Sequence, residues 1–193
     1  GTVGYGSPLH AGYFTRGLAH NVPLIDGEGQ EGHAPGEMLD FAPTRARAVQ
    51  PNYRPGVRAE RELAIEGDAL RDTVTVECSG GPRRLGLAFH LQGRTRLPDG
   101  FWNDTDFARG RPEEFSHWTE VRAGRFKGKL EIEAVFTGGT AVRVVVSAPG
   151  DFRVWRGSSP DTPPRRRESF FLELTDPASR ATFTTMLVPI PAR

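Results

Sequence analysis

The sequence predicts an all-β fold, an antiparallel β-sandwich, from three observations. Residues alternate between apolar and polar in 70–76 and in 130–136, which is the pattern of half-buried strands. Twenty-three glycines and sixteen prolines are scattered between short β-rich runs, and helical periodicity is scarce. Many short strands at such spacing are typical of a sandwich, and a chain of 193 residues suits a single domain that spans 1–193.

The expected strands can be placed in chain order. A short apolar strand follows His20, and Asp26-Gly27 is expected to form the turn that closes a hairpin. Alternation recurs in 57–65, where Arg61 breaks it, and β-branched or aromatic residues favour strands in 87–91, 141–146 and 169–174. Turns are expected at Gly80-Gly81-Pro82, Pro98-Asp99-Gly100, Gly138-Gly139 and Pro149-Gly150-Asp151.

Two stretches interrupt the strand pattern. Residues 98–124 hold five large aromatic side chains among acids and arginines, and we interpret them as a long loop that docks on a neighbouring domain. Residues 158–167 are expected to form a second exposed loop. Its three arginines, Arg165, Arg166 and Arg167, either grip carboxylates of a ligand or are simply solvated.

Charge and composition limit the classes of partner. The 25 basic and 24 acidic residues leave a net charge of +1, so no overall field favours binding to nucleic acid or to a membrane. All but two of the basic residues are arginines, whose planar guanidinium suits carboxylates and sulfates, although a genome rich in G and C would produce the same bias. The single cysteine, Cys78, excludes an internal disulfide, and no apolar run approaches the roughly 20 residues of a membrane helix.

The first thirty residues carry the most specific pattern. They hold, in this order, Gly1-Thr2, Gly4-Tyr5, Tyr13-Phe14, Ala19-His20-Asn21 and Asp26-Gly27. This segment resembles the signature of the heparinase II/III-like polysaccharide lyases, in the oligoalginate-lyase branch, and departs from it at Val22-Pro23.

The resemblance implies that the chain is the C-terminal β-sandwich of a larger enzyme whose α/α toroid lies upstream. Such an enzyme would cleave a uronate-containing acidic polysaccharide by β-elimination, in the periplasm or after secretion. Because the toroid and part of the site would lie before Gly1, we expect the 193 residues alone to be inactive.

The resemblance also assigns candidate site residues. His20 would be a metal ligand for Zn²⁺ or another divalent ion, with the remaining ligands upstream of this chain; the alternative is a histidine satisfied by backbone groups. Tyr5 would act in proton transfer, with Tyr13 as its rival, and simple packing is the alternative for both. His10 and Arg16 would neutralise the substrate carboxylate, unless they are ordinary exposed polar residues.

A second function class stays open, a non-catalytic carbohydrate-binding or structural β-sandwich module. The fold alone does not separate it from the lyase, because sandwiches carry many functions. Other catalytic patterns, such as a Gly-x-Ser-x-Gly elbow, a phosphate-binding loop or His-Glu-x-x-His, do not occur in the sequence. Glu60 and Glu62 alternate on one face of a strand, which is more typical of a solvated surface than of a catalytic pair.

Overall fold

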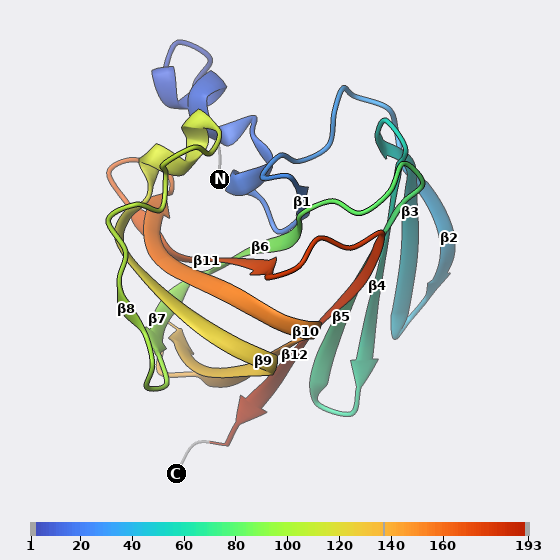
Figure 1. The fold of residues 1–193 in the computed structure, drawn as a ribbon. Coiled ribbons are helices and arrows are strands. Elements are labelled where there is room, and N and C mark those ends of the chain that lie inside the picture. The colour runs from blue at the N-terminus through green and yellow to red at the C-terminus, as the bar shows by residue number, and fades with distance from the viewer. Residues whose placement is uncertain (1–2, 137, 192–193) are drawn as a thin grey trace.

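The computed structural model describes residues 3–136 and 138–191, so Gly1 and Thr2 of the N-terminal motif lie outside the described part (Figure 1). These residues form one antiparallel, open sheet and three short helical turns. The helical turns are η1 (His10–Phe14), η2 (Gly17–Ala19) and η3 (Glu113–His117). The strands are β1 (Pro23–Ile25), β2 (Glu37–Ala42), β3 (Arg45–Arg54), β4 (Val57–Glu66), β5 (Ala69–Cys78), β6 (Leu85–Leu91), β7 (Gly93–Arg96), β8 (Trp102–Asn103), β9 (Thr119–Phe136), β10 (Ala141–Pro160), β11 (Arg166–Leu174) and β12 (Arg180–Ile190).

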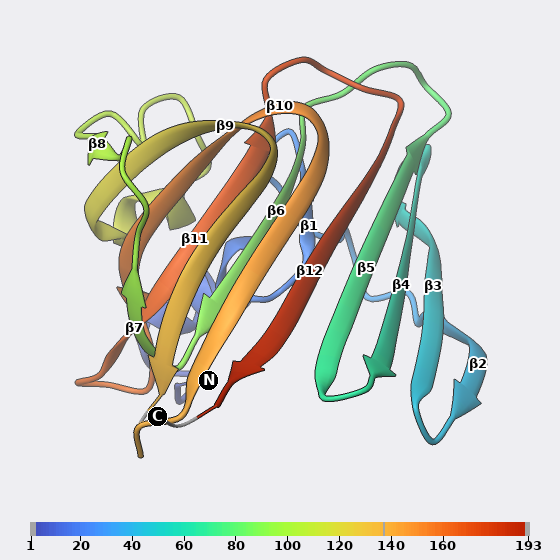
Figure 2. The ribbon, with the colours of Figure 1, turned by 90° about the horizontal axis from the view of Figure 1, so that it is seen from below.

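The long strand β10 joins two halves of the sheet. It pairs with β9 along most of its length, while its other edge pairs first with β12 and then with β11. From β12 the sheet continues through β5, β4, β3 and β2, and from β11 it continues through β6 and β1 (Figure 2). The register between β9 and β10 shifts between Ser147 and Asp151. The turn predicted at Pro149-Gly150-Asp151 is therefore wrong, because Gly150, with φ 74°, lies in a β-bulge inside a continuous strand.

The first hydrophobic core lies between the two halves, as expected for a sandwich. Alternate residues of β5, such as Val74 and Val76, pack in one cluster with Leu87 of β6 and Phe170 of β11. The alternating residues of β9 and β10 join the same cluster. The alternation predicted in 70–76 and 130–136 thus marks residues that face this core, and the strand predicted at 141–146 contributes Val144 and Val146 to it.

A second core covers the opposite face of β6 and β11. Phe171 and Ala88 belong to it, whereas their chain neighbours Phe170 and Leu87 face the first core. The cover consists of the N-terminal segment, including Tyr13, and the 101–118 segment, which contains β8 and η3 (Figure 1). Every residue of β6 is consequently buried.

This second core corrects the interpretation of residues 98–124 as a loop that docks on a neighbouring domain. Phe107, Phe115 and Trp118 pack against Tyr13 and Phe14 of the same chain. The stretch also contains β8, η3 and the start of β9. The aromatic side chains are explained by long-range packing within the chain, and Trp102 is the exception, with 41% of its surface exposed.

Local turn chemistry agrees with the sequence at the first hairpin. Asp26 and Gly27 have φ of 54° and 87°, and Ile25 and Glu28 exchange both backbone hydrogen bonds across them. Two central residues with positive φ are those of the turn that best matches the twist of a hairpin. The Asp26 carboxylate accepts hydrogen bonds from the Arg84 amide and the Arg83 guanidinium, which ties this turn to the start of β6.

The region before β4 contains strands that the sequence pattern does not indicate. All six residues of β2 are exposed, so no apolar alternation marks them.

The exposed loop predicted over 158–167 is also largely strand, since β10 continues to Pro160 and β11 begins at Arg166. Glu60 and Glu62 do share one face, and both are paired with arginines of neighbouring strands.

No helix among the described residues has both the length and the apolar character needed to cross a membrane.

Replacing Phe171 should destabilise the protein strongly, because its ring is fully buried at the centre of the second core. We expect Phe171→Ala to lower the free energy of unfolding by roughly 3–5 kcal/mol, measured by urea denaturation. Phe41→Ala is the matched control, since 78% of Phe41 is exposed, and its effect should stay within about 0.5 kcal/mol. Equal effects of the two substitutions would contradict this assignment of the core.

Candidate functional site

The Ala19-His20-Asn21 segment is held from three strands. Arg167 of β11 donates a hydrogen bond of 2.6 Å to the Ala19 carbonyl, and Arg61 of β4 donates one of 2.7 Å to the Asn21 carbonyl. The backbone amide of His90 in β6 donates to the Asn21 side-chain oxygen at 2.9 Å. An exposed segment between η2 and β1 is therefore fixed in place by charged and backbone donors on three different strands.

Arg61 reaches Asn21 because a second partner orients it. Its guanidinium makes two hydrogen bonds with the carboxylate of Asp72, at 2.7 and 2.6 Å. This paired geometry leaves one nitrogen, Nη1, aimed at the Asn21 carbonyl. The break in apolar alternation at Arg61 thus has a structural reason, since this arginine supports the segment that carries His20.

The orientation of His20 fixes which ring nitrogen is available. Nε2 lies 2.9 Å from the Phe14 carbonyl oxygen, and a carbonyl can only accept a hydrogen bond, so Nε2 carries the proton. In the neutral ring the lone pair then belongs to Nδ1. His20 is exposed, and its Nδ1 accepts no hydrogen bond within the described residues.

Beneath this segment lies a buried polar chain. His90 Nε2 donates to the Leu18 carbonyl at 3.0 Å, so its Nδ1 accepts from the Ser169 hydroxyl at 2.6 Å. Ser169 in turn accepts from Ser159, also at 2.6 Å. Burial, together with the positive charge of Arg167, lowers the pKa of His90 to about 3, so the ring is neutral.

A serine hydroxyl bonded to an imidazole is also the arrangement of a nucleophilic catalyst. Here both hydroxyls are fully buried, so no substrate reaches them. His90 instead ties Leu18 and Asn21 to β6, one on each side of His20. Its hydrogen bonds join His90 to Ser169, which is 79 positions away in the chain, and Ser169 to Ser159, which is 10 positions away. From the sequence alone, His90 is predicted only to be a strand residue.

Tyr5 and Tyr13 differ sharply in access. Tyr5 has 92% of its surface exposed, and its ring lies 4.6 Å from the His10 ring, centroid to centroid. His10 has a buried Nδ1 without a hydrogen-bond partner. Tyr13 is fully buried, and its hydroxyl accepts a hydrogen bond from Trp118 Nε1 at 3.2 Å, so it is part of the second core. The structure brings Tyr5 and His10 together, and their roles stay predictions.

Arg16 lies in an acidic setting. It lines a pocket of about 420 Å³ with Glu28, Glu31, Glu113 and Glu114. Burial raises the pKa of the Glu114 carboxyl. Arg16 itself donates to the Ala11 carbonyl at 3.1 Å, and within the described ranges no hydrogen bond or ion pair joins it to His20. Its predicted role with a substrate carboxylate stays a prediction.

Residues 3–136 and 138–191 contain no group of three or more His, Cys, Asp or Glu side chains placed to hold a metal ion. His20 on its own fits a single metal ligand, because its protonated Nε2 is held by a carbonyl in the way that orients metal-bound histidines. The described residues thus fit one ligand of a zinc site and not a complete set.

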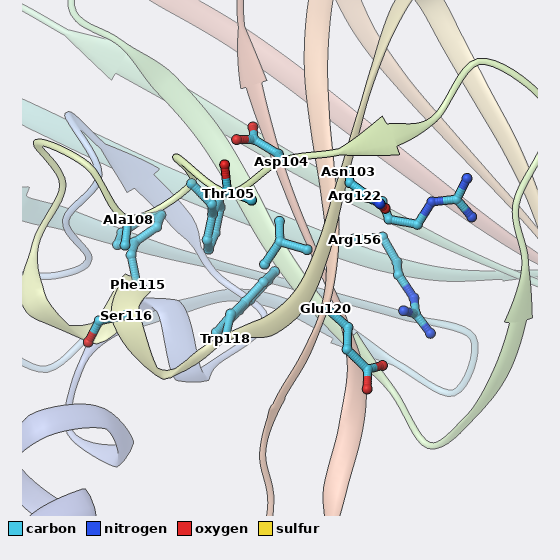
Figure 3. Close-up of a pocket in the computed structure, with 12 residues that line it drawn as sticks. Asn103, Asp104, Thr105, Ala108, Phe115, Ser116, Trp118, Glu120, Arg122 and Arg156 are labelled. Atoms are coloured by element: carbon cyan, nitrogen blue, oxygen red, sulfur yellow. The ribbon is translucent and has the colours of Figure 1, made fainter.

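A pocket of about 760 Å³ lies beside the start of β9, away from the residues that sequence reasoning selected. Figure 3 shows Arg122, Arg156 and Glu120 on one side of it and Phe115 and Trp118 on the other. Arg156 is paired with Glu168, whereas Glu120 has no ion pair in the described part of the chain. Glu120 adopts a positive φ of 54° beside a second register shift of β9 and β10, between Arg156 and Ser158.

Comparison with known proteins shows likeness in structure and not in sequence. No family model matches the chain, and no curated protein matches it. A solved heparinase III superposes on 92% of this chain with a TM-score of 0.57 and 12% identity. A putative aldose 1-epimerase from Escherichia coli K12 superposes on 86% of it with a TM-score of 0.51, also at 12% identity, over 69% of its own chain. At these identities the likeness shows a shared fold. The chain spans 24% of the heparinase III chain.

Protonation of His90 should make the folded protein sensitive to acid. Its pKa is about 3 when folded and near 6.5 in a model peptide, so the unfolded chain binds more protons between these values. The contribution of neutral His90 to the free energy of unfolding is therefore fully present above about pH 6.5. It is lost as the pH falls towards 3, by up to roughly 1.4 kcal/mol per pH unit.

We expect His90→Gln to remove this contribution, leaving a shallower dependence of unfolding free energy on pH between about 4 and 6. Urea denaturation at several pH values measures both slopes. The difference between the two proteins isolates His90 from the acidic side chains, which also lose stabilising contacts at low pH. Identical slopes would show that His90 is not buried in its neutral form.

Proposed function

We propose that this chain is the β-sandwich part of a polysaccharide lyase that cleaves a uronate-containing acidic glycan by β-elimination. Two findings support the proposal. The fold is shared with a heparinase III over 92% of this chain, and the N-terminal residues resemble the signature of heparinase II/III-like lyases. The fold is also shared with a putative aldose 1-epimerase, a protein whose name refers to a sugar.

The observation that carries the proposal is the set of hydrogen bonds that holds His20 and the backbone on both sides of it. Three strands hold the backbone on both sides of this exposed residue, and the Phe14 carbonyl accepts a hydrogen bond from Nε2, so the lone pair of the neutral ring is on Nδ1. The hydrogen bond to Phe14 also fits the alternative, a histidine satisfied by a backbone group, so the support for a ligand comes from the hydrogen bonds on both sides of His20. Rigid support of a single exposed side chain is what a ligand or a proton-transfer group requires.

The proposed cofactor is Zn²⁺ or another divalent ion, with His20 Nδ1 as one ligand and the other ligands outside the described residues. When bound, such an ion would add positive charge beside the substrate and stabilise the segment that binds it.

In the proposed reaction a base removes the proton on C5, next to the uronate carboxylate. The C5–H electron pair forms a C4=C5 double bond, the bond from C4 to the bridging oxygen breaks, and an acid protonates that oxygen. Tyr5 is the proposed proton-transfer residue, since its exposed phenol can reach a bound glycan. His10 and Arg16 are the proposed partners of the substrate carboxylate, and a periplasmic or secreted location is proposed with the same family.

The alternative, a non-catalytic carbohydrate-binding module, has its own support. The shared fold with a heparinase III and a putative aldose 1-epimerase fits equally a domain that binds a saccharide without cleaving it. Assays for unsaturated uronate product separate the two functions when applied to the complete enzyme, with the 193 residues alone as the inactive control.

Removing the His20 ring should remove the metal. In the complete enzyme, His20→Ala is expected to lose bound zinc, measured by elemental analysis, and to lower the thermal unfolding temperature, because a bound ion stabilises only the folded form. His33→Ala is the matched control, since His33 is an exposed histidine outside the Ala19–Asn21 support. A full metal content in His20→Ala would show that His20 is not a ligand.

Removing the Tyr5 hydroxyl should slow turnover with little effect on substrate binding, because the phenol would act only as a proton moves. The expected loss in kcat for Tyr5→Phe is roughly a hundred- to ten-thousand-fold. Tyr13→Phe is the control, since its buried hydroxyl is bonded to Trp118 and its loss should affect stability rather than rate. Normal kcat in Tyr5→Phe would exclude Tyr5 from catalysis.

A further inference from the structure

A row of cationic side chains crosses β9 and β10 beside the second core. Arg125 and Lys127 of β9 lie on the face that Ala123 buries in that core, and Arg153 of β10 pairs in register with Arg125. Like charges placed directly opposite each other on neighbouring strands destabilise a sheet. Arg153 has partners of its own in Asp104, Trp102 and Trp155, whereas Arg125 faces another arginine across the strands.

Aromatic rings hold part of this row rigidly. The Arg153 guanidinium lies 5.5 Å from the Trp102 ring centroid and 4.7 Å from that of Trp155. Asp104 accepts hydrogen bonds from both Arg153, at 2.6 Å, and Trp155, at 2.9 Å. The Arg125 guanidinium also lies over the Trp102 ring, 5.9 Å from its centroid. Cations fixed in this way lose little side-chain entropy when an anion binds.

Arg125, Arg153 and Trp155 line a pocket of about 720 Å³, a size typical of small-ligand sites. Trp102 lies beside this pocket, against Arg125 and Arg153. Its charged lining consists of Arg111, Arg125, Lys127 and Arg153 against Asp151 and Glu173. Arg111 is paired with Glu173 at 3.2 Å, and Arg153 with Asp104.

Two of these cations lack an ion-pair partner among the described residues, and Asp151, which lies opposite Lys127 across β9 and β10, forms no ion pair with it. Arg125 and Lys127 form no ion pair within residues 3–136 and 138–191, and the buried Nε of Arg153 lacks a hydrogen-bond partner. Many arginines of β3, β4 and β5 are matched with carboxylates, whereas Arg125 and Lys127 are not. Arg94, Arg122, Arg166 and Arg167 also form no ion pair in the described part of the chain, so unmatched positive charge occurs elsewhere on the sheet too. A bound anion would supply the missing partner.

We propose that this pocket is a second, non-catalytic binding site for an anionic saccharide. Carboxylate or sulfate groups bind Arg125 and Lys127, and the exposed part of Trp102 packs against a sugar ring. The anionic character of the ligand follows from the charges on this face, and its identity as a saccharide rests on the proposed function. The lining of this pocket includes neither His20 nor Phe14, Arg61, His90 or Arg167, the residues whose hydrogen bonds hold it.

Binding of defined oligosaccharides to the 193-residue protein tests the proposal. Isothermal titration calorimetry is performed with a heparin hexasaccharide, an alginate hexasaccharide, neutral cellohexaose and inorganic sulfate. We expect at least one acidic hexasaccharide to bind, with an affinity that falls as salt rises, and cellohexaose not to bind. The Arg125→Ala/Lys127→Ala double variant should bind roughly tenfold or more weakly, because it loses two charge-assisted contacts.

The matched control is Arg96→Ala/Arg143→Ala, which removes the same charge from two exposed arginines paired with β9 acids. It should bind like the unaltered protein, and thermal unfolding checks that both double variants fold. Trp102→Ala should weaken binding of the acidic hexasaccharide and leave any binding of sulfate unchanged, which separates a saccharide site from a simple anion site.

The proposal is overturned if neither acidic hexasaccharide binds, if both double variants lose affinity equally, or if Trp102→Ala has no effect on the hexasaccharide. His20→Ala should bind with unchanged affinity. Failure of the lyase assays would leave these binding results intact, so the two proposals are tested separately.

Discussion

The burial of β6 and β11 on both faces is the constraint on which the other features depend. Phe170 and Phe171 are neighbours in the chain, yet each is fully buried in a different core. All of β6 and the stretch 169–172 of β11 are buried, so a polar side chain there has no access to water. His90 and Ser169, which lie opposite each other on these two strands, must therefore satisfy one another, and they do so with Ser159 in a chain of hydrogen bonds.

That buried chain has an effect at the surface. Because Nδ1 of His90 is occupied by Ser169, only Nε2 remains to bond the Leu18 carbonyl, and the amide of His90 bonds Asn21. Two residues that flank His20 are thus tied to a strand that packing holds immobile. Low polarity around His90 keeps the ring neutral and strengthens each of its hydrogen bonds, so the orientation of an exposed residue derives from the core beneath it.

The sequence predicts what depends on local pattern and misses what depends on distant contacts. Alternation locates Val74 and Val76 in the core, and Asp26-Gly27 identifies the first hairpin turn, since both signals act within a few residues. The exposed strand β2 has no such pattern. Gly150 is predicted to lie in a turn because a turn and a β-bulge both favour glycine, which adopts a positive φ easily. The aromatic residues of 101–118 and the partners of His90 are defined by segments far away in the chain. One signal was available for the site, the interruption of an apolar face by Arg61, which supports Asn21.

The distribution of charge shows why composition alone does not reveal a binding surface. Nearly all basic residues are arginines, and this bias fits an acidic ligand and a genome rich in G and C equally well. On the outer face of β3, β4 and β5 the arginines alternate with glutamates across strands, so they neutralise one another and leave little charge for a partner. On β9 and β10 the register instead places Arg125 opposite Arg153. Strand register therefore helps to decide which charges are neutralised: on β9 and β10 it places an acid opposite Lys127 and an arginine opposite Arg125.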